Sequence, residues 1–149
     1  ELDRVTVRLV MDDLLQALQH AHDRDVVHRD VKPSNVLVDT DGHAHLIDFG
    51  IARVESQFRL TRTTDALGTT AYAAPEQLQL GTSSARSDVF AAGRILTELL
   101  DILREPVDSP VRGVARIATE ADPSRRWPSA NQMRQTLEPL WERTDSCPL

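Results

Sequence analysis

The sequence predicts an α+β fold that is mainly α-helical and contains one small antiparallel β-hairpin. Apolar residues recur at helical spacing in several segments, whereas strand-like sequence is confined to two short runs on either side of an Asp-Gly pair. With 149 residues, of which 40% are hydrophobic, the chain is long enough to bury one core. We therefore expect a single domain over residues 1–149, without internal repeats or a linker.

The first two elements are an amphipathic helix and the hairpin. The helix is expected over residues 2–21, because apolar side chains recur there at helical spacing while Asp and Gln occupy other faces. Its apolar positions are Leu2, Val5, Leu9, Val10, Leu14, Leu18 and Ala21. The runs "NVLVD" and "HAHLID" then flank "TDG", which is typical of a two-stranded hairpin.

The rest of the chain is predicted to be a long loop followed by helices. Residues 51–67 lose the apolar pattern and are rich in Thr and Arg, which indicates a surface loop. The run "SDVFAAGRILTELLDIL", after a Ser87/Asp88 start, is apolar on nearly all sides and predicts a buried central helix. Shorter helices are expected over about residues 111–121 and from Ser129, where Gln132 completes a capping-box signature. Pro139 should end or bend the last helix.

Charge and composition exclude several classes of partner. A net charge of −6 leaves no basic surface for nucleic acid or anionic lipid. No apolar stretch is long enough to cross a bilayer, and the opening "ELDRVTVRLV" lacks the features of a secretion signal, so we expect a cytoplasmic protein. Cys147 is the only cysteine and indicates neither an internal disulfide nor a thiol-rich metal site.

Polar residues on both sides of the hairpin indicate a reaction centre. Asp30 precedes Lys32 by two positions, and the hairpin that separates Asn35 from Asp48 brings these two oxygen donors together. An amide and a carboxylate suit Mg²⁺, which takes few protein ligands and keeps water and phosphate oxygens. Asp30 is suited to orient a hydroxyl and accept its proton, while Lys32 offsets charge on a transferring phosphate.

Several motifs, taken in order, make the chain similar to a known family. "HRDVKPSN" is followed by "DFG", "GTTAYAAPE" and "SDVFAAG", and this series resembles the C-terminal catalytic lobe of a eukaryotic-type (Hanks-type) protein kinase. Lys32 and the Gly68-Thr69 pair resemble the serine/threonine branch, in its bacterial form. The resemblance implies ATP and Mg²⁺ as cofactors, and transfer of the γ-phosphoryl group to Ser or Thr hydroxyls of protein substrates.

The resemblance also implies a role for each residue of the site. The implied catalytic residues are Asp30 as the base, Lys32 as the phosphate-contacting lysine, and Thr69 as a link from the loop to both. The implied nucleotide-binding residues are Lys32, Asn35, Leu37 and Asp48, of which Asn35 and Asp48 hold magnesium and Leu37 lies beneath adenine.

Five further residues are implied to be structural supports. His28 and Phe49 should stack in the regulatory core. Asp88 should hold the backbone of the catalytic loop from the central helix, and Glu76 should pair with Arg126.

A regulatory role is implied for the loop after "DFG". Arg29 directly precedes the implied base, and Thr61 and Thr63 occupy positions at which similar bacterial kinases carry phosphothreonines. A phosphate there would bring negative charge and acceptor oxygens to the Arg29 guanidinium, and would activate the enzyme. The alternative is that Asp65 or Glu55 already neutralises Arg29.

Two features depart from the family pattern. The sequence has no G-x-G-x-x-G loop and Lys32 is its only lysine, so we expect the N-terminal β-lobe to be missing from it. Residues 101–110 join the central helix directly to the next helix, where the family normally has a further helix used in substrate docking, so this region is shortened. The chain alone is therefore expected to be inactive.

Two other classes of protein fit the sequence less well than an active protein kinase. A degenerate kinase-like module that binds or regulates a partner has no physical need for Asp30, Lys32, Asn35 and Asp48 together, so an active parent is favoured. A small-molecule phosphotransferase of related fold fits less well, because its metal loop does not usually read Asp-Phe-Gly and it lacks an "APE" segment.

Overall fold

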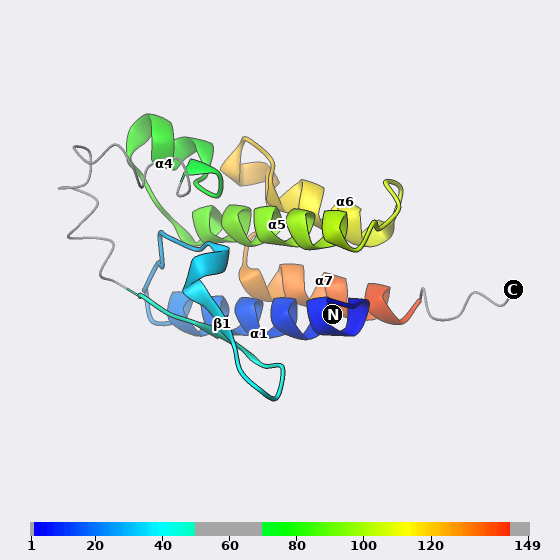
Figure 1. Cartoon of the computed structure of the whole chain (residues 1–149). Coiled ribbons are helices and arrows are strands. Elements are labelled where there is room, and N and C mark those ends of the chain that lie inside the picture. Colours follow the sequence, from blue (N-terminus) through cyan, green and yellow to red (C-terminus); the bar gives the residue numbers. More distant parts are fainter. Residues whose placement is uncertain (1, 50–69, 144–149) are drawn as a thin grey trace, which may run out of the picture.

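The computed structural model describes residues 2–49 and 70–143 (Figure 1). In chain order its elements are α1 (Arg4–His22), η1 (Pro33–Asn35), β1 (Val36–Val38), β2 (Ala44–Leu46), α4 (Pro75–Leu80), α5 (Ala85–Ile102), α6 (Pro110–Ala118), η3 (Pro123–Arg125) and α7 (Ala130–Glu142). The predicted α+β lobe, mainly helical with a small antiparallel sheet, is confirmed.

Helix α5 lies at the centre of the lobe. It packs against α1, α6 and α7, while α1 also packs against α7 and β2 (Figure 1). The largest fully buried side chains of this core are Met11, Leu14, Leu15, Leu18, Leu96, Leu100 and Met133. Helix α4 and the segment before the hairpin lie near the N-terminal end of α5, so one end of the helical core carries the polar segments.

The predicted helix α1 is confirmed, and most of its expected apolar positions are buried, among them Val10, Leu14 and Leu18. Asp3 is its N-cap, and the Asp3 carboxylate accepts a hydrogen bond from the Thr6 N–H at 2.7 Å. The core face runs through Val7 and Met11, whereas Val5 and Leu9 are 63% and 38% exposed. The prediction that Val5 and Leu9 face the core is wrong, because a shift of two residues turns a side chain about 200° around a helix axis.

The predicted hairpin is confirmed. β1 pairs with β2 in antiparallel register, with Val36 opposite Leu46. The turn contains Gly42 at φ +87°, a conformation that favours glycine, and the Asp39 carboxylate accepts hydrogen bonds from the N–H groups of Asp41 and His43 at 2.9 and 3.0 Å.

Helix α5 is the buried central helix that the sequence predicted, but it begins earlier. Its N-cap is Ser84, so Ser87 and Asp88 lie within the first turn and are buried. Gly93 allows α6 to approach closely, because a Cβ at this position would lie 2.6 Å from the Cβ of Ala118. The close packing of α5 against α6 therefore depends on glycine at position 93.

The last helix continues through its proline. Ser129 is the N-cap of α7 and accepts a hydrogen bond from the Gln132 N–H at 3.1 Å, as the sequence indicated. Of the two effects expected of Pro139, an end of the helix is wrong, since α7 extends to Glu142, whereas a bend stays a prediction. Pro139 is exposed, as is the residue four positions before it, while Trp141 is buried and keeps the last turn on the core.

Within the described ranges, no helix has the length and apolar character needed to cross a bilayer.

Candidate active site

Three polar side chains meet in the segment between α1 and the hairpin. The Lys32 Nζ lies 3.4 Å from Oδ2 of Asp30. Asn35, which is buried at the end of η1, donates from Nδ2 to the Asp30 carbonyl at 2.8 Å and lies 3.4 Å from Asp30 Oδ2. The structure thus brings Asp30, Lys32 and Asn35 together, as the sequence predicted. The Asp30 side chain remains 18% exposed and so is open to a second reactant.

Asp88 of α5 holds the backbone of this segment. Its carboxylate is 1% exposed and accepts the N–H of His28 at 2.8 Å and the N–H of Arg29 at 2.9 Å. Arg29 has a φ of 75°, which is unfavourable for a residue with a Cβ and persists only where surrounding contacts hold it. The expected support by Asp88 is confirmed, and it stabilises a strained residue next to Asp30.

A third partner of Asp88 was not foreseen in the sequence. His22, at the end of α1, places Nε2 2.8 Å from the Asp88 Oδ2, and its side chain is 7% exposed. Nothing in the sequence distinguishes His22 from His20, which lies on the exposed face of the same helix. Only the packing of α1 on α5 selects it.

The hairpin closes onto the same segment. The Ile47 N–H donates to the Asn35 carbonyl at 2.9 Å, so Asp48, the next residue, lies at the same open end of the hairpin as Asn35. Asp48 is exposed and has a φ of 62°. Leu37 lies on β1 and is 53% exposed. The exposed side chains of Leu37 and Asp48 therefore lie on the hairpin, and the buried Asn35 lies at its open end.

His28 links the two sides of the site. Its Nε2 lies 2.7 Å from the Ile47 carbonyl and its Nδ1 lies 3.1 Å from the Asp30 N. Since a carbonyl only accepts and a backbone N–H only donates, these two contacts match the tautomer with its proton on Nε2. Its ring meets that of Phe49 edge-on at 4.7 Å, which confirms the expected contact between these two side chains.

The oxygen donors fit a magnesium ion that arrives with phosphate. No group of three His, Cys, Asp or Glu side chains that could hold a metal occurs in residues 2–49 and 70–143. Asn35 and Asp48 offer one amide and one carboxylate oxygen donor at one end of the hairpin, too few for a protein-only cage but suitable for Mg²⁺ that keeps water and phosphate ligands.

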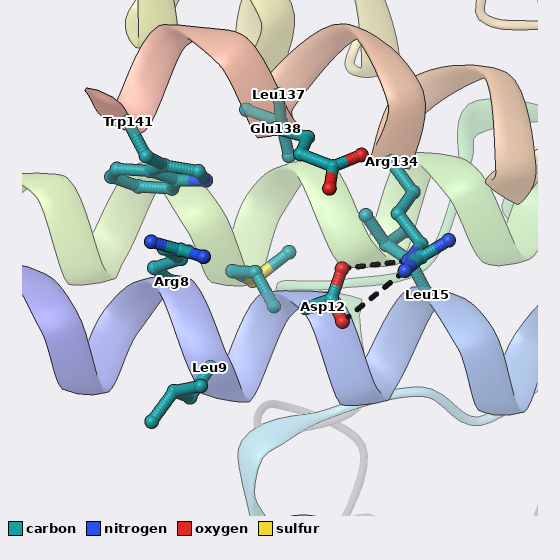
Figure 2. Close-up of a pocket in the computed structure, with 9 residues that line it drawn as sticks. Arg8, Leu9, Asp12, Leu15, Arg134, Leu137, Glu138 and Trp141 are labelled. Atoms are coloured by element: carbon teal, nitrogen blue, oxygen red, sulfur yellow. Dashed lines mark hydrogen bonds and ion pairs between the residues drawn. The ribbon is translucent and has the colours of Figure 1, made fainter. Parts of the chain in front are cut away.

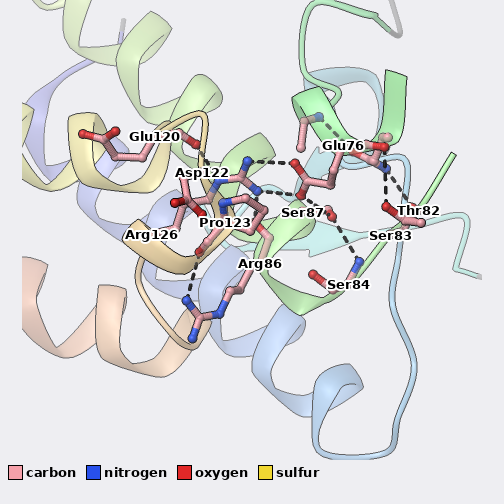
Figure 3. Close-up of polar contacts among 12 residues, drawn as sticks. Glu76, Thr82, Ser83, Ser84, Arg86, Ser87, Glu120, Asp122, Pro123 and Arg126 are labelled. Atoms are coloured by element: carbon pink, nitrogen blue, oxygen red, sulfur yellow. Dashed lines mark hydrogen bonds and ion pairs between the residues drawn. The ribbon is translucent and has the colours of Figure 1, made fainter. Parts of the chain in front are cut away.

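The expected pair of Glu76 and Arg126 is confirmed (Figure 3). Arg126 Nη1 and Nη2 donate to the two Glu76 carboxylate oxygens at 2.7 and 2.8 Å, and Arg126 is only 3% exposed. These bonds lower the pKa of Glu76. Arg126 also donates to the backbone carbonyls of Arg86, Glu120 and Ala121, so it joins α4 to α5 and to the segment that precedes η3.

Comparison with known proteins agrees with this geometry. The family model described as "Protein kinase domain" matches residues 1–142. The chain belongs to the protein kinase family.

Three relatives of this kinase chain come from bacteria. It is 37% identical over 132 residues to the serine/threonine-protein kinase PrkC of Bacillus subtilis, covering 86% of this chain and 20% of PrkC. It is 34% identical over 154 residues to a "probable serine/threonine-protein kinase" of Streptomyces coelicolor, covering 84% of this chain and 23% of the relative. PknL of Mycobacterium tuberculosis is 44% identical over 91 residues, covering 61% of this chain and 23% of PknL. The chain thus spans about a fifth of the length of these relatives, and the resemblance to bacterial Hanks-type serine/threonine kinases is confirmed.

Several residues predicted from the kinase resemblance lie outside the described residues. These are Thr61, Thr63 and Thr69, together with Glu55 and Asp65. Arg29 is half-buried, and within residues 2–49 and 70–143 its guanidinium makes no ion pair. A phosphate partner for this kinase arginine therefore stays a prediction.

A second ion-pair site of the kinase lobe lies away from these residues. A groove of about 80 Å³ runs between α1 and α7, and Arg134 crosses it to Asp12, with Nε 2.6 Å from Oδ1 (Figure 2). Small-molecule sites usually enclose roughly 300–1,000 Å³. The groove is too small for a nucleotide, and the pair of Arg134 and Asp12 lies across it.

Proposed function

We propose that this chain is the C-terminal catalytic lobe of a serine/threonine protein kinase, which transfers the γ-phosphoryl group of ATP to Ser or Thr hydroxyls of proteins. The observation that carries the proposal is the cluster of Asp30, Lys32 and Asn35 on a backbone that Asp88 holds from the core. Phosphoryl transfer depends on positioning and charge stabilisation, and this cluster supplies both.

The roles follow from charge and exposure. The Asp30 carboxylate is open to solvent at its edge and is suited to accept the proton of a substrate hydroxyl. Lys32, at 3.4 Å from Asp30, is proposed to offset negative charge on the transferring phosphoryl group. Thr69 is proposed to link the loop to both residues. Leu37 is proposed to contact adenine, since it is an exposed apolar side chain on β1.

Asn35 and Asp48 are proposed as the magnesium ligands. Mg²⁺ would neutralise negative charge on the nucleotide phosphates. The hydrogen bond from Asn35 to the Asp30 carbonyl orients the Asn35 side chain toward this role. The positive φ of Asp48, just after the end of β2, sets the direction of the Asp48 side chain.

The complete enzyme is proposed to contain an N-terminal lobe as well. Residues 1–149 contain no glycine-rich loop to cover the phosphates, and the chain spans about a fifth of its relatives' length. We propose that residues 1–149 form one C-terminal lobe, shortened near residues 101–110, where only residues 103–109 separate α5 from α6. We further propose that it acts in the cytoplasm, where ATP is available, on protein rather than nucleic acid, given the net charge of −6.

The test is phosphoryl transfer by the intact protein. Asp30→Asn and Asp48→Asn should each abolish turnover, the first through loss of the base and the second through loss of a metal ligand. Asp41→Asn, a change at an exposed carboxylate in the hairpin turn, is the control and should leave the rate unchanged. Retained transfer by the Asp48→Asn protein at saturating magnesium would contradict the ligand assignment. A wild-type protein without turnover would favour the degenerate binding module.

The 149-residue chain alone should have little activity and weak affinity for Mg-ATP, because it lacks half of the phosphate-binding site. Isothermal titration with Mg-ATP measures this affinity. Tight binding to the isolated chain would show that the N-terminal lobe contributes less than proposed.

Regulation is proposed to act through Arg29. Phosphate on Thr61 or Thr63 would pair with its guanidinium and order the loop before α4. Mass spectrometry of the intact kinase after incubation with Mg-ATP, beside a Thr61→Ala/Thr63→Ala variant, tests this. An unmodified loop together with full activity of the variant would refute it.

A further inference from the structure

Gln77 of α4 makes three hydrogen bonds from one side-chain amide. Its Oε1 accepts the Ala74 N–H at 2.9 Å, and its Nε2 donates to the Arg29 carbonyl at 3.1 Å and to the Ser83 hydroxyl at 3.1 Å. A backbone N–H only donates, so the oxygen of the amide must face Ala74 and the nitrogen must face Arg29. The orientation of Gln77 is therefore determined by its partners.

The hydrogen bond from Gln77 is made to Arg29, a residue whose backbone other contacts also hold. Arg29 has a φ of 75°, and its N–H is held by Asp88 of α5 at 2.9 Å. Its carbonyl belongs to the same planar peptide unit as the Asp30 N–H, which lies 3.1 Å from Nδ1 of His28. Gln77 therefore binds the carbonyl, and His28 the N–H, of the peptide group that joins Arg29 to Asp30.

Rotation of that plane would turn the Asp30 side chain. Without the Gln77 donor, the Arg29 carbonyl would be free to relax toward a less strained conformation, and the carboxylate would move with it. Gln77 lies on α4, shortly after Tyr72 and Ala74. Its amide connects this part of the chain to Arg29, the residue next to Asp30.

Gln77 and Arg29 are both half-buried, so the Arg29 carbonyl is only partly open to solvent. The space bounded by Arg29, Asp30 and Gln77 has a volume of about 10 Å³, which is at the lower limit for one water molecule. A leucine at position 77 would occupy a similar volume without a donor, and would leave the Arg29 carbonyl unpaired.

We propose that Gln77 is a positioning residue for phosphoryl transfer, which sets the orientation of Asp30 through the Arg29 carbonyl. The proposal rests on the proposed kinase function, because it assigns Gln77 to the same reaction centre. Gln77 itself contacts no reacting atom. Its removal should therefore slow the chemical step and leave nucleotide binding intact.

The experiment compares variants of the intact kinase in steady-state phosphorylation of a generic Ser/Thr substrate protein such as casein. Gln77→Leu and Gln77→Glu both remove the donor to Arg29, and Gln77→Glu keeps the acceptor for Ala74. Each should lower kcat at least tenfold while the KM for ATP and the Mg-ATP dissociation constant stay within twofold of wild type. Ser83→Ala, which removes the other acceptor of the same Nε2, is the matched control and should keep kcat within twofold.

The outcomes separate the two proposals. Wild-type kcat in either Gln77 variant, or loss of kcat together with loss of Mg-ATP affinity in both, would overturn the positioning role, since the second result is that of a merely structural residue. Should Gln77→Leu fail to fold, the Gln77→Glu variant decides alone by the same criteria. A wild-type protein whose rate equals that of Asp30→Asn would refute the kinase function itself, and the positioning role with it.

Discussion

Replacing Glu76 with Gln is expected to lower the free energy of unfolding by about 3–5 kcal/mol, the usual cost of removing one partner from a buried ion pair. Arg126 is 3% exposed and cannot regain water when its counter-charge is lost. Three backbone carbonyls would remain as its acceptors, those of Arg86, Glu120 and Ala121, and these keep the guanidinium in place without neutralising it. The glutamine amide keeps one acceptor oxygen, so the variant loses both the compensating charge and one of the two hydrogen bonds from Arg126.

Urea unfolding at pH 7 measures this loss, and thermal unfolding gives a second reading. For a chain of this size, 1 kcal/mol corresponds to a fall of roughly 2–4 °C in Tm, so we expect a fall of about 6–20 °C. Asp101→Asn is the matched control. It removes the acidic partner of Arg112, whose Nη1 lies 2.8 Å from Oδ1 of Asp101. The Asp101 side chain is 63% exposed, and exposed ion pairs contribute less than about 1 kcal/mol to the free energy of unfolding.

The pH dependence of stability supplies an independent check. The folded pKa of Glu76 is lowered, chiefly by its hydrogen bonds to Arg126, so its contribution is present above the unfolded pKa and is lost as pH falls through the folded value. Stability of the wild type should therefore decline below about pH 4.5 more steeply than that of Glu76→Gln. A Glu76→Gln protein within 1 kcal/mol of wild type at pH 7, with the same acid profile, would refute the reasoning.

Three further changes test other parts of the lobe. Gly93→Ala should lower Tm, at a cost of about 1–3 kcal/mol, because the new Cβ would lie 2.6 Å from that of Ala118; calorimetry measures it. Tyr72 is the only tyrosine, and its partial burial and its hydrogen bond to Glu98 raise its pKa to about 12. Phenolate absorbance should therefore titrate near pH 12, and Glu98→Gln should move the midpoint back toward 10. Asp88→Asn should reduce kcat of the intact kinase at least tenfold, since an amide nitrogen cannot accept the N–H bonds that the carboxylate accepts.

The hairpin and the residues around it were predictable because each depends on a local signal. The Asp-Gly pair needs a turn with positive φ, which Gly42 provides, and a hairpin necessarily brings Asn35 and Asp48 to one end. The pairing of Glu76 with Arg126 was predictable only through the family resemblance, since 50 residues separate them and no local rule connects them.

Other features were not predictable, because packing between helices decides them. The apolar residues of α1 occur on more than one face, and only contact with α5 and α7 shows that the face with Val7, not Val5, is buried. Gln77 carries no sequence signal either, since a glutamine on a short helix is usually solvated, and its role requires the Arg29 carbonyl to lie opposite.

The single carboxylate of Asp88 connects two parts of the chain that are distant in sequence. It receives bonds from α1 and from two consecutive peptides of the catalytic loop, yet it contributes little to the apolar core that α5 forms with α1, α6 and α7. Without this carboxylate, the N–H groups of His28 and Arg29 would lose their acceptor and His22 of α1 would lose its partner. A change at this one position would therefore loosen the end of α1 and the backbone before Asp30 together, although 66 and 59 residues separate Asp88 from His22 and Arg29.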